Sequence, residues 1–269
     1  MTRRRFLGYD EGKQTLGLYD TSASEPAWLL GLAGLPLARD LQKLDSDKVL
    51  VGFNRGFFEV HVNSGKILTL QDRWNGVTSV RRVGERTLLT GIGLEGRLGV
   101  TVATLTATAG LEKMARRNGN YVRLMRLTPT GTYLLCTDDH ILETTPDLVE
   151  LRKLTAPGFR HAWMAQRMED GSTLVSAGYG AFMARFDAEG QLCQRFGGTG
   201  EVPSEVAPFF YAGFQVMEDG HIIAVNWQGH GPENGHKGRQ LVEFDASGNY
   251  ADSWSSPANI SSLQGLLIL

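Results

Sequence analysis

Two histidines stand in settings that suit proton transfer. His161 lies in the segment FRHAW, between Arg160 and Trp163, and His230 lies in NWQGHGPENGHKG (226–238), a segment rich in glycine. An imidazole gains and loses a proton near neutral pH, so both histidines are candidates for general acid–base catalysis. A histidine beside a loop can equally serve to fix that loop by a hydrogen bond, and His161 fits this structural role as well.

Arginines and aromatic residues at comparable positions suggest what such histidines would act on. The planar guanidinium of an arginine binds carboxylate or sulfate groups through paired hydrogen bonds. Aromatic rings offer flat apolar faces against which a sugar ring can pack. These residue types predict a small polar ligand that is carbohydrate-like or a sugar acid. The predicted ligand-binding residues are Arg160, Trp163, Tyr121, Arg123, Tyr179, Tyr211, Asn226, Trp227, Asn54 and Arg55.

A divalent metal is the one cofactor that the sequence suggests. Asp138, Asp139 and His140 follow one another in TDDHIL, and their side chains are suitable metal ligands. We therefore predict that these three residues form the metal site. A solvated turn explains the same residues, and the chain has no HExxH or HxH spacing to favour a metal.

The candidate residues are scattered along the chain, so a repeated scaffold must gather them. The segments HAWMAQRMEDGSTLVSAGYG (161–180) and AFMARFDAEGQLCQRFG (181–197) recur as YAGFQVMEDGHIIAVNW (211–227) and RQLVEFDASGNYADSW (239–254). The MEDG turns lie 49 residues apart, whereas Asp187 and Asp245 of the second turns lie 58 apart. The later copy therefore carries nine extra residues, which are most of the segment 226–238.

Each repeat predicts four antiparallel strands joined by tight turns, because Asp-Gly between alternating apolar residues is a strong hairpin signal. Four strands per 40–50 residues is the period of a β-propeller blade. The sequence thus predicts an all-β protein, a single six-bladed propeller domain over residues 1–269. Its ring is closed where the C-terminal strand joins the N-terminal blade. The predicted blades span about 36–75, 76–118, 119–157, 158–205, 206–256, and 257–269 together with 1–33.

The recurring DG-x-hydrophobic-V and FD-x-x-G turns resemble those of six-bladed propellers of the NHL-repeat and SMP-30/gluconolactonase-like superfamily. A more distant similarity is to arylsulfotransferase-like propellers, which implies a catalytic histidine near the central channel. Similarity to the gluconolactonases implies acidic and asparagine metal ligands at the mouth of the channel. The residues of suitable chemistry are Asn54, Asp138, Asp139, Asn226 and Asp10.

In a propeller, the connections between blades and those between the second and third strands of each blade meet around the central channel. A concave pocket with converging polar groups is expected there. The glycines of 226–238 permit left-handed backbone, which predicts a lid that folds across the mouth of the channel. The alternative is an exposed and mobile excursion.

The composition excludes several function classes. The chain has 269 residues, of which 21% are charged, and a formal net charge of −2. A nucleic-acid partner is not expected without a basic surplus. Because no run of about 18 apolar residues occurs, no membrane association is expected. No secretory signal follows the N-terminal MTRRR, so we expect a cytoplasmic protein or the mature form of an exported one.

Two functions remain open at this stage. In the first, His161 and His230 transfer protons in a lyase, epimerase or hydrolase reaction on the bound sugar-like molecule. In the second, the propeller is a non-catalytic scaffold that binds a ligand or a protein partner through the 226–238 loop. The fold class alone does not choose between them.

Overall fold

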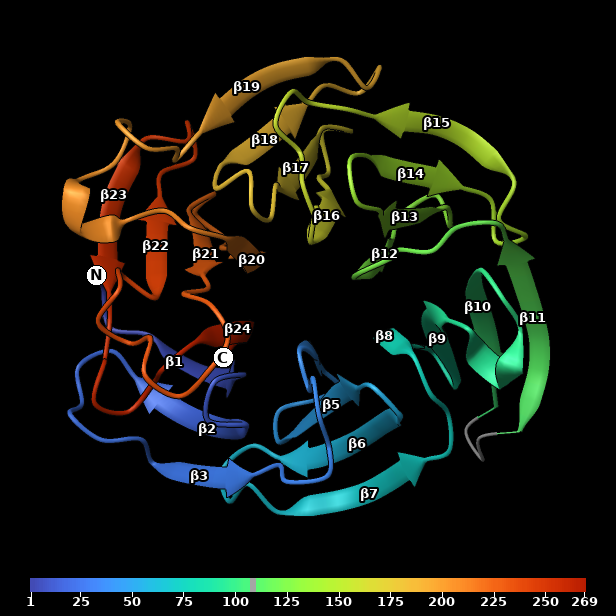
Figure 1. Cartoon of the computed structure of the whole chain (residues 1–269), viewed down its shortest axis with the longest axis horizontal. Coiled ribbons are helices and arrows are strands. Elements are labelled where there is room, and N and C mark those ends of the chain that lie inside the picture. Colours follow the sequence, from blue (N-terminus) through green and yellow to red (C-terminus); the bar gives the residue numbers. More distant parts are fainter. Residues whose placement is uncertain (107–109) are drawn as a thin grey trace.

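The computed structural model describes residues 1–106 and 110–269, which form six four-stranded antiparallel sheets arranged as the blades of a ring (Figure 1). Residues 107–109, within the predicted blade 76–118, lie outside the described residues. The predicted six-bladed propeller is confirmed. Each blade runs from an innermost strand beside the central channel to an outermost strand at the rim, and it is named below by its innermost strand.

The bounds of the strands are as follows for each blade, from the channel outward. The β24 blade has β24 (Leu263–Ile268), β1 (Arg5–Asp10), β2 (Thr15–Asp20) and β3 (Trp28–Gly31). The β4 blade has β4 (Asp40–Lys43), β5 (Lys48–Phe53), β6 (Gly56–His61) and β7 (Ile67–Asp72). The β8 blade has β8 (Val77–Val83), β9 (Arg86–Ile92), β10 (Val100–Leu105) and β11 (Leu111–Arg117). The β12 blade has β12 (Met125–Leu127), β13 (Tyr133–Cys136), β14 (Ile141–Thr144) and β15 (Glu150–Leu154). The β16 blade has β16 (Met164–Arg167), β17 (Thr173–Ser176), β18 (Met183–Phe186) and β19 (Leu192–Phe196). The β20 blade has β20 (Tyr211–Val216), β21 (Ile222–Asn226), β22 (Leu241–Phe244) and β23 (Tyr250–Trp254).

The ring is closed by the two ends of the chain. β24 pairs antiparallel with β1, with Phe6 opposite Ile268 and Gly8 opposite Leu266. The last strand of the sequence is therefore the innermost strand of the blade that begins the sequence, and both termini lie on that side of the ring in Figure 1. This pairing covers the edges of both strands, which would otherwise be open to other chains.

The repeated Asp-Gly turns have a local cause. The carboxylate of Asp170 accepts a hydrogen bond from the backbone N–H of Ser172 at 2.9 Å, and Asp219 accepts one from His221 at 3.0 Å. Gly171 and Gly220 have φ of 84° and 83°, a left-handed conformation that glycine adopts without steric cost. These turns join β16 to β17 and β20 to β21 at the same end of their blades.

Apolar side chains pack between neighbouring blades. The largest cluster joins the β16, β20 and β24 blades and includes Trp163, Phe210, Trp227 and Phe244, all buried. Burying each such side chain stabilises the fold by about 1.5–3 kcal/mol. Among the described residues no helix is long and apolar enough to cross a membrane.

Candidate functional site

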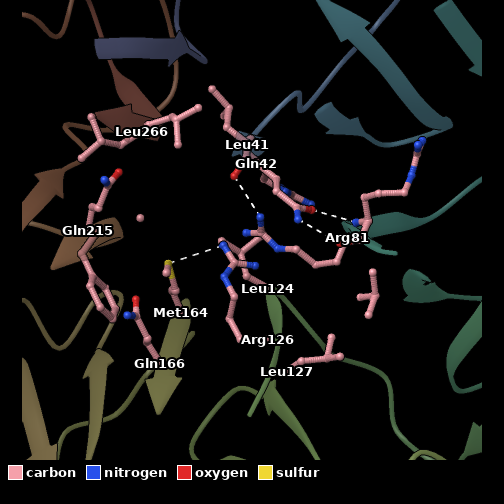
Figure 2. Close-up of a pocket in the computed structure, with 16 residues that line it drawn as sticks. Leu41, Gln42, Arg81, Leu124, Arg126, Leu127, Met164, Gln166, Gln215 and Leu266 are labelled. Carbon is pink, nitrogen blue, oxygen red and sulfur yellow. Dashed lines mark hydrogen bonds between the residues drawn. The ribbon is translucent and has the colours of Figure 1, made fainter. Parts of the chain in front are cut away.

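A cavity of about 430 Å³ occupies the central channel. All six innermost strands, or the residues beside them, line it, which identifies it as the axis of the ring (Figures 1 and 2). The innermost strands all begin at one end of the channel, here called the loop end, and finish at the other, the hairpin end. The cavity extends from Arg39 and Met164 at the loop end to Val83 and Leu127, the last residues of β8 and β12.

Two arginines and one aspartate form an ion network within the channel. Asp40 on β4 is 1% exposed and lies 2.6 Å from the guanidinium of Arg81 and 3.0 Å from that of Arg126. Ser79 and the backbone N–H of Val80 donate to its other oxygen. Burial alone would raise the pKa of Asp40, but Arg126 and Arg81 outweigh it and lower the pKa. Asp40 is thus a fully partnered buried carboxylate.

A second pair of arginines lies at the loop end and has no carboxylate partner among the described residues. Arg39 is 7% exposed, and its guanidinium carbon lies 5.3 Å from the ring centre of Trp163. Arg123 lies 5.8 Å from the same ring and 4.0 Å from the ring of Tyr121. These four side chains form one contiguous group, the Arg39–Arg123 cluster.

Polar atoms of the Arg39–Arg123 cluster are buried without hydrogen-bond partners in the described part of the chain. They are Nε of Arg39 and Arg123, Nε1 of Trp163 and the hydroxyl of Tyr121. Buried donors in folded proteins are nearly always paired, and an unpaired one typically costs 1–3 kcal/mol. The cluster therefore presents several donors suited to an incoming acceptor, such as a carboxylate.

The electrostatics of the channel favour an anion. Burial, and then the neighbouring Arg123, lower the pKa of Arg39 from its usual value to about 10. Burial and Arg126 likewise lower the pKa of Arg81 to about 9. Four arginines (Arg39, Arg81, Arg123 and Arg126) thus share the channel with one carboxylate, Asp40, a surplus of three positive charges. An anion bound in the channel would offset this surplus.

His161 lies at the loop end, beside the Arg39–Arg123 cluster. Its ring centre is 4.7 Å from that of Tyr121, and its Nε2 lies 3.4 Å from Oδ1 of Asp138, on the connection between β13 and β14. The imidazole is 40% exposed, so solvent or a ligand can reach it. His161 thus contacts Tyr121 of the Arg39–Arg123 cluster, and it has a carboxylate that can orient the imidazole.

The backbone around His161 is held in an unusual conformation. His161 has φ of 57°, a left-handed value that costs about 1–2 kcal/mol for a residue with a Cβ. Its N–H donates to Asp138 Oδ1 at 2.9 Å, which helps to fix this geometry. Gly178 packs against it so closely that a Cβ there would lie 2.1 Å from the carbonyl oxygen of His161. Strain that is held from several sides is a recurring property of functional residues.

An aromatic series connects His161 to His230. The ring of Tyr179 lies 5.4 Å from His161 and 6.2 Å from Trp227, and the ring of Trp227 lies 4.7 Å from His230. His230 is 73% exposed and contacts Glu11, with Nδ1 and Oε1 3.0 Å apart. The two predicted catalytic histidines thus each pair with a carboxylate, at opposite ends of this series.

The 226–238 loop is anchored on the neighbouring blade. Asn234 is buried, and its side-chain NH₂ donates to the carbonyls of Gly229, His230 and Gly231 at 2.7–3.2 Å. Ser261, just before β24, donates to the Gly231 carbonyl and accepts from the N–H of Asn234. The loop also borders a hollow of about 500 Å³ against residues 199–209. The loop is therefore packed against the residues that precede β24 and β20. These contacts fit neither a mobile excursion nor a free lid.

Several predicted ligand-binding residues use their polar atoms inside the protein. Asn226 accepts from the N–H groups of Phe209 and Phe210 and donates to three backbone carbonyls. Tyr211 is fully buried, and its hydroxyl donates to the Gly197 carbonyl at 2.8 Å. Their roles in this structure are to fix connections and fill the core.

Asn54, Arg55 and Arg160 also differ from the Arg39–Arg123 cluster in their contacts. Arg55 forms a two-point ion pair with Asp72 at 2.6 and 2.8 Å, away from the channel cavity. Asn54 joins two connections through its backbone. Arg160 stacks on the ring of Tyr179 at 4.8 Å, so it lies along the aromatic series.

The predicted metal ligands are not assembled into one site. Asp138 turns to His161, whereas His140 Nδ1 contacts Asp139 Oδ1 at 2.7 Å. Within residues 1–106 and 110–269, no group of three or more histidine, cysteine, aspartate or glutamate side chains is arranged to hold a metal ion. Asp138 thus points away from Asp139 and His140, which the sequence spacing does not reveal.

The predicted ligand-binding residues do not include three arginines of the channel, Arg39, Arg81 and Arg126. Arg81 and Arg126 lie inside β8 and β12, and Arg39 directly precedes β4. A signal was present in the sequence, because arginine is rarely buried unless it is paired. Arginine in the first strand of several repeats therefore indicates a charged channel.

The sequence matches no known protein family and no curated protein. Similar folds occur among solved structures. A protein of unknown function from Bacteroides caccae has a TM-score of 0.80 at 16% identity, covering 100% of this chain and 99% of that one. A functionally unknown protein from Desulfotomaculum acetoxidans has a TM-score of 0.62 at 11% identity, covering 98% of each chain.

A third similar structure is an enzyme. It is a catalytically inactive histidine-to-alanine variant of virginiamycin B lyase from Staphylococcus aureus, solved with quinupristin. Its TM-score is 0.56 at 13% identity, covering 81% of this chain and 70% of that one. Likeness at this level of identity establishes the fold that the two chains share. The chain is a β-propeller whose similar structures include both an enzyme and proteins of unknown function.

Proposed function

We propose that this propeller binds a sugar acid, or a similar small carboxylate, at the loop end of its channel and removes a proton from it with His161. The observation that carries this proposal is the Arg39–Arg123 cluster. The buried guanidinium of Arg39 and the half-buried one of Arg123, neither with a carboxylate partner among the described residues, flank Trp163 next to the His161–Asp138 pair. The guanidinium groups would hold the carboxylate, and the ring of Trp163 holds these two groups in place.

The chemistry follows from the position of the charges. A hydrogen on the carbon next to a carboxylate becomes more acidic when cations neutralise the negative charge that develops on the carboxylate oxygens. His161 accepts this proton in its neutral form, and Asp138 acts as a positioning residue that orients the imidazole and stabilises its charged form. This step is common to lyases and epimerases that act on sugar acids.

Tyr121 supplies the complementary group. Burial raises the pKa of Tyr121, although Arg123 opposes the shift, so the phenol stays protonated at neutral pH. In an elimination, the electron pair of the broken C–H bond forms a C=C bond, and the oxygen on the next carbon leaves with its electrons. Tyr121 would donate its proton to that oxygen. In an epimerisation the intermediate instead takes a proton back on its opposite face.

Two comparisons bear on this proposal. Virginiamycin B lyase is a propeller of related shape in which a histidine-to-alanine variant is inactive, and this agrees with a histidine-dependent lyase on such a scaffold. The finer resemblance to NHL-repeat and SMP-30-like propellers stays a prediction. The residues that those enzymes would use for a metal do not gather here, so the proposal uses no metal.

The test is a thermal-shift screen of sugar acids, their neutral parent sugars and lactones, with metal analysis of the purified protein. We expect the acids to raise Tm and the neutral sugars not to, because a ligand that binds only the folded state stabilises it. Turnover of any hit is then followed by the ultraviolet absorbance of a new conjugated double bond and by proton exchange in deuterated water. The absence of a shift from every acid would refute the proposal.

His161→Asn separates catalysis from folding. Asparagine tolerates left-handed backbone better than most residues, so the conformation at φ 57° is retained. We expect unchanged binding of the acid but a loss of turnover of about 10²–10⁴-fold, the usual contribution of a general base. Arg123→Gln should instead weaken binding. His161→Asn with full turnover would exclude His161 as the base.

A second candidate function is ligand binding without catalysis. The observation that favours it is the fixed 226–238 loop, which borders the hollow of about 500 Å³ together with Phe209, an exposed aromatic side chain. Such a hollow is large enough for a small ligand or for a side chain of a protein partner. Binding of a ligand without turnover or proton exchange, abolished by Phe209→Ala but not by Arg123→Gln, would support this function.

A further inference from the structure

We infer that the channel holds a second anion site, beside Asp40, where Arg81 and Arg126 bind a phosphate or sulfate group together with Gln166. This site is separate from the proposed carboxylate site at the loop end and does not depend on it. The three residues come from three different blades, β8, β12 and β16, and all line the channel cavity. Figure 2 shows Gln166 across the cavity from Arg81, with Arg126 between them.

The two guanidinium groups are held close together by Asp40. Both lie within 3.0 Å of the same oxygen, Asp40 Oδ1. Arg81 also donates to the Leu41 carbonyl and Arg126 to the Met125 carbonyl, so neither side chain can swing away without losing buried hydrogen bonds. This fixed placement removes most of the entropy cost of gathering two cations around an anion.

Donors remain available after these contacts. An arginine carries five N–H donors. Nε of Arg81 is buried without a partner among the described residues, and the remaining contact of Arg126 is a long one to the sulfur of Met164 at 3.5 Å. Thioether sulfur is a weak acceptor. An oxyanion would replace this weak contact with a charge-assisted hydrogen bond, which is about twice as strong as a neutral one.

Gln166 differs from the other glutamines of the cavity. Gln42 is paired with the backbone of Arg82 through both amide atoms, at 2.7 and 2.9 Å. Gln215 is paired in the same way with Ile268. The side chain of Gln166 has no hydrogen bond in the described part of the chain, so its NH₂ group is available to a ligand in the cavity.

The charge balance beside Asp40 favours an anion. Asp40 neutralises one of the two arginines, and the other charge stays buried, since Arg81 and Arg126 are 12% and 14% exposed. A carboxylate at the loop end would offset one of the two charges of Arg39 and Arg123 and would leave this charge beside Asp40 unchanged. Guanidinium groups from two blades and an amide from a third approach from different directions, which suits the tetrahedral oxygens of phosphate or sulfate better than a flat carboxylate.

The test is calorimetric titration of the full chain with potassium phosphate, at constant ionic strength maintained with potassium chloride. We expect saturable binding of one phosphate per chain. Parallel titrations with potassium sulfate and with a hexose 6-phosphate show whether the site takes a free anion or the phosphate group of a larger molecule. If the wild-type protein binds phosphate at one site, phosphate at ten times its Kd should increase the folding equilibrium constant about elevenfold.

Two variants and one control locate the site. Arg126→Gln should raise the phosphate Kd by about 10–100-fold, since it removes a charged hydrogen bond. Gln166→Leu should raise it by about 2–10-fold and leaves the Asp40 network intact, so it decides the outcome if Arg126→Gln fails to fold. Arg86→Gln removes one exposed positive charge outside the channel and should change the Kd by less than twofold.

Arg123→Gln distinguishes this site from the carboxylate site. It should weaken binding of a sugar acid and preserve binding of phosphate. If the sugar-acid screen finds nothing while the phosphate results hold, only the proposed function fails. The inference is overturned if wild-type protein gives no saturable heat with phosphate, sulfate or the sugar phosphate, if Gln166→Leu and Arg86→Gln behave alike, or if Arg123→Gln abolishes phosphate binding as well.

Discussion

Replacement of Arg39 by methionine should make the ligand-free protein more stable while it destroys the proposed carboxylate site. Methionine is unbranched and apolar, so it can fill the space of the arginine stem beside Trp163 without bringing a charge into the channel. The prediction rests on the finding that Arg39 is 7% exposed and has no carboxylate partner in the described residues. A stabilising change at a binding residue is a signature of a site that is kept for its ligand.

The magnitude follows from the buried charge. The pKa of Arg39 is lowered from 12.5 to about 10, mainly by burial and then by Arg123. One pKa unit corresponds to about 1.4 kcal/mol, so the folded protein disfavours the charged guanidinium by about 3 kcal/mol. The variant also loses the stacking of Arg39 on Trp163, which reduces its gain in stability by about 0.5–2 kcal/mol. We expect Arg39→Met to raise the free energy of unfolding by about 1–3 kcal/mol.

The pH dependence has a definite sign. Because the folded state holds the Arg39 proton less tightly than the unfolded chain, the unfolded chain binds more protons between about pH 10 and 12.5. Stability of the wild type relative to Arg39→Met therefore rises with pH in that range. Below about pH 10 the Arg39 guanidinium is protonated in both the folded and the unfolded state. The difference in unfolding free energy between the variant and the wild type is then constant.

The assay is urea denaturation of both proteins, analysed with the m-value, together with titration of a sugar acid found in the screen. Arg126→Met is the matched control from the same channel. It leaves the buried Asp40 with one cation instead of two, and it should destabilise the protein by about 2 kcal/mol or more. Destabilisation of Arg39→Met by more than about 1 kcal/mol at an unchanged m-value, or full sugar-acid affinity in it, would refute the reasoning.

Three further predictions concern the scaffold of the site. Asn234→Ala removes three hydrogen bonds that hold the 226–238 loop, and we expect faster hydrogen exchange and proteolysis there with little change in global Tm; equal protection would show that the loop is held otherwise. Asp40→Asn should destabilise the protein at neutral pH, and since Arg126 and Arg81 lower the pKa of Asp40 against the effect of burial, the difference from wild type should begin to shrink as the pH falls below about 4; a constant difference down to pH 2 contradicts this. Gly178→Ala should cost about 3 kcal/mol or more in urea denaturation, because its Cβ would lie 2.1 Å from the carbonyl oxygen of His161 and its own φ is 60°; Gly84→Ala, also at φ 57° but in open space, is the control and should cost about 1 kcal/mol.

The fold could be predicted because its signals are local and repeated. The Asp-Gly turns that recur 49 residues apart are hairpins in which Asp170 and Asp219 bind the backbone two residues ahead. Such contacts form within four residues, so the sequence pattern and the structure coincide. The closure of the ring followed from counting strands, because the N-terminal segment supplies three strands of a blade and the C-terminal segment supplies the fourth.

The site could be predicted in part, because its contacts join distant residues. Histidine and aromatic residues at the connections were identifiable, but the pairing of His161 with Asp138 depends on a left-handed backbone that the sequence does not reveal. Adjacent arginines illustrate the limit. Arg81 binds Asp40 in the channel, whereas Arg82 binds Glu59 on β6, and only the direction of each side chain from β8 separates them. Tyr211 likewise begins a strand as a predicted ligand residue would, yet packing buries it.

The closure of the ring by β24 sets the order in which the molecule can be completed during synthesis. β1 is synthesised about 250 residues before its inner neighbour β24. At about 5–20 residues per second, the inner edge of β1 stays without its partner for on the order of ten to fifty seconds. Ribosome-bound chains that stop before β24 should therefore be cut readily by protease at β1–β3, and release of the finished chain should protect them.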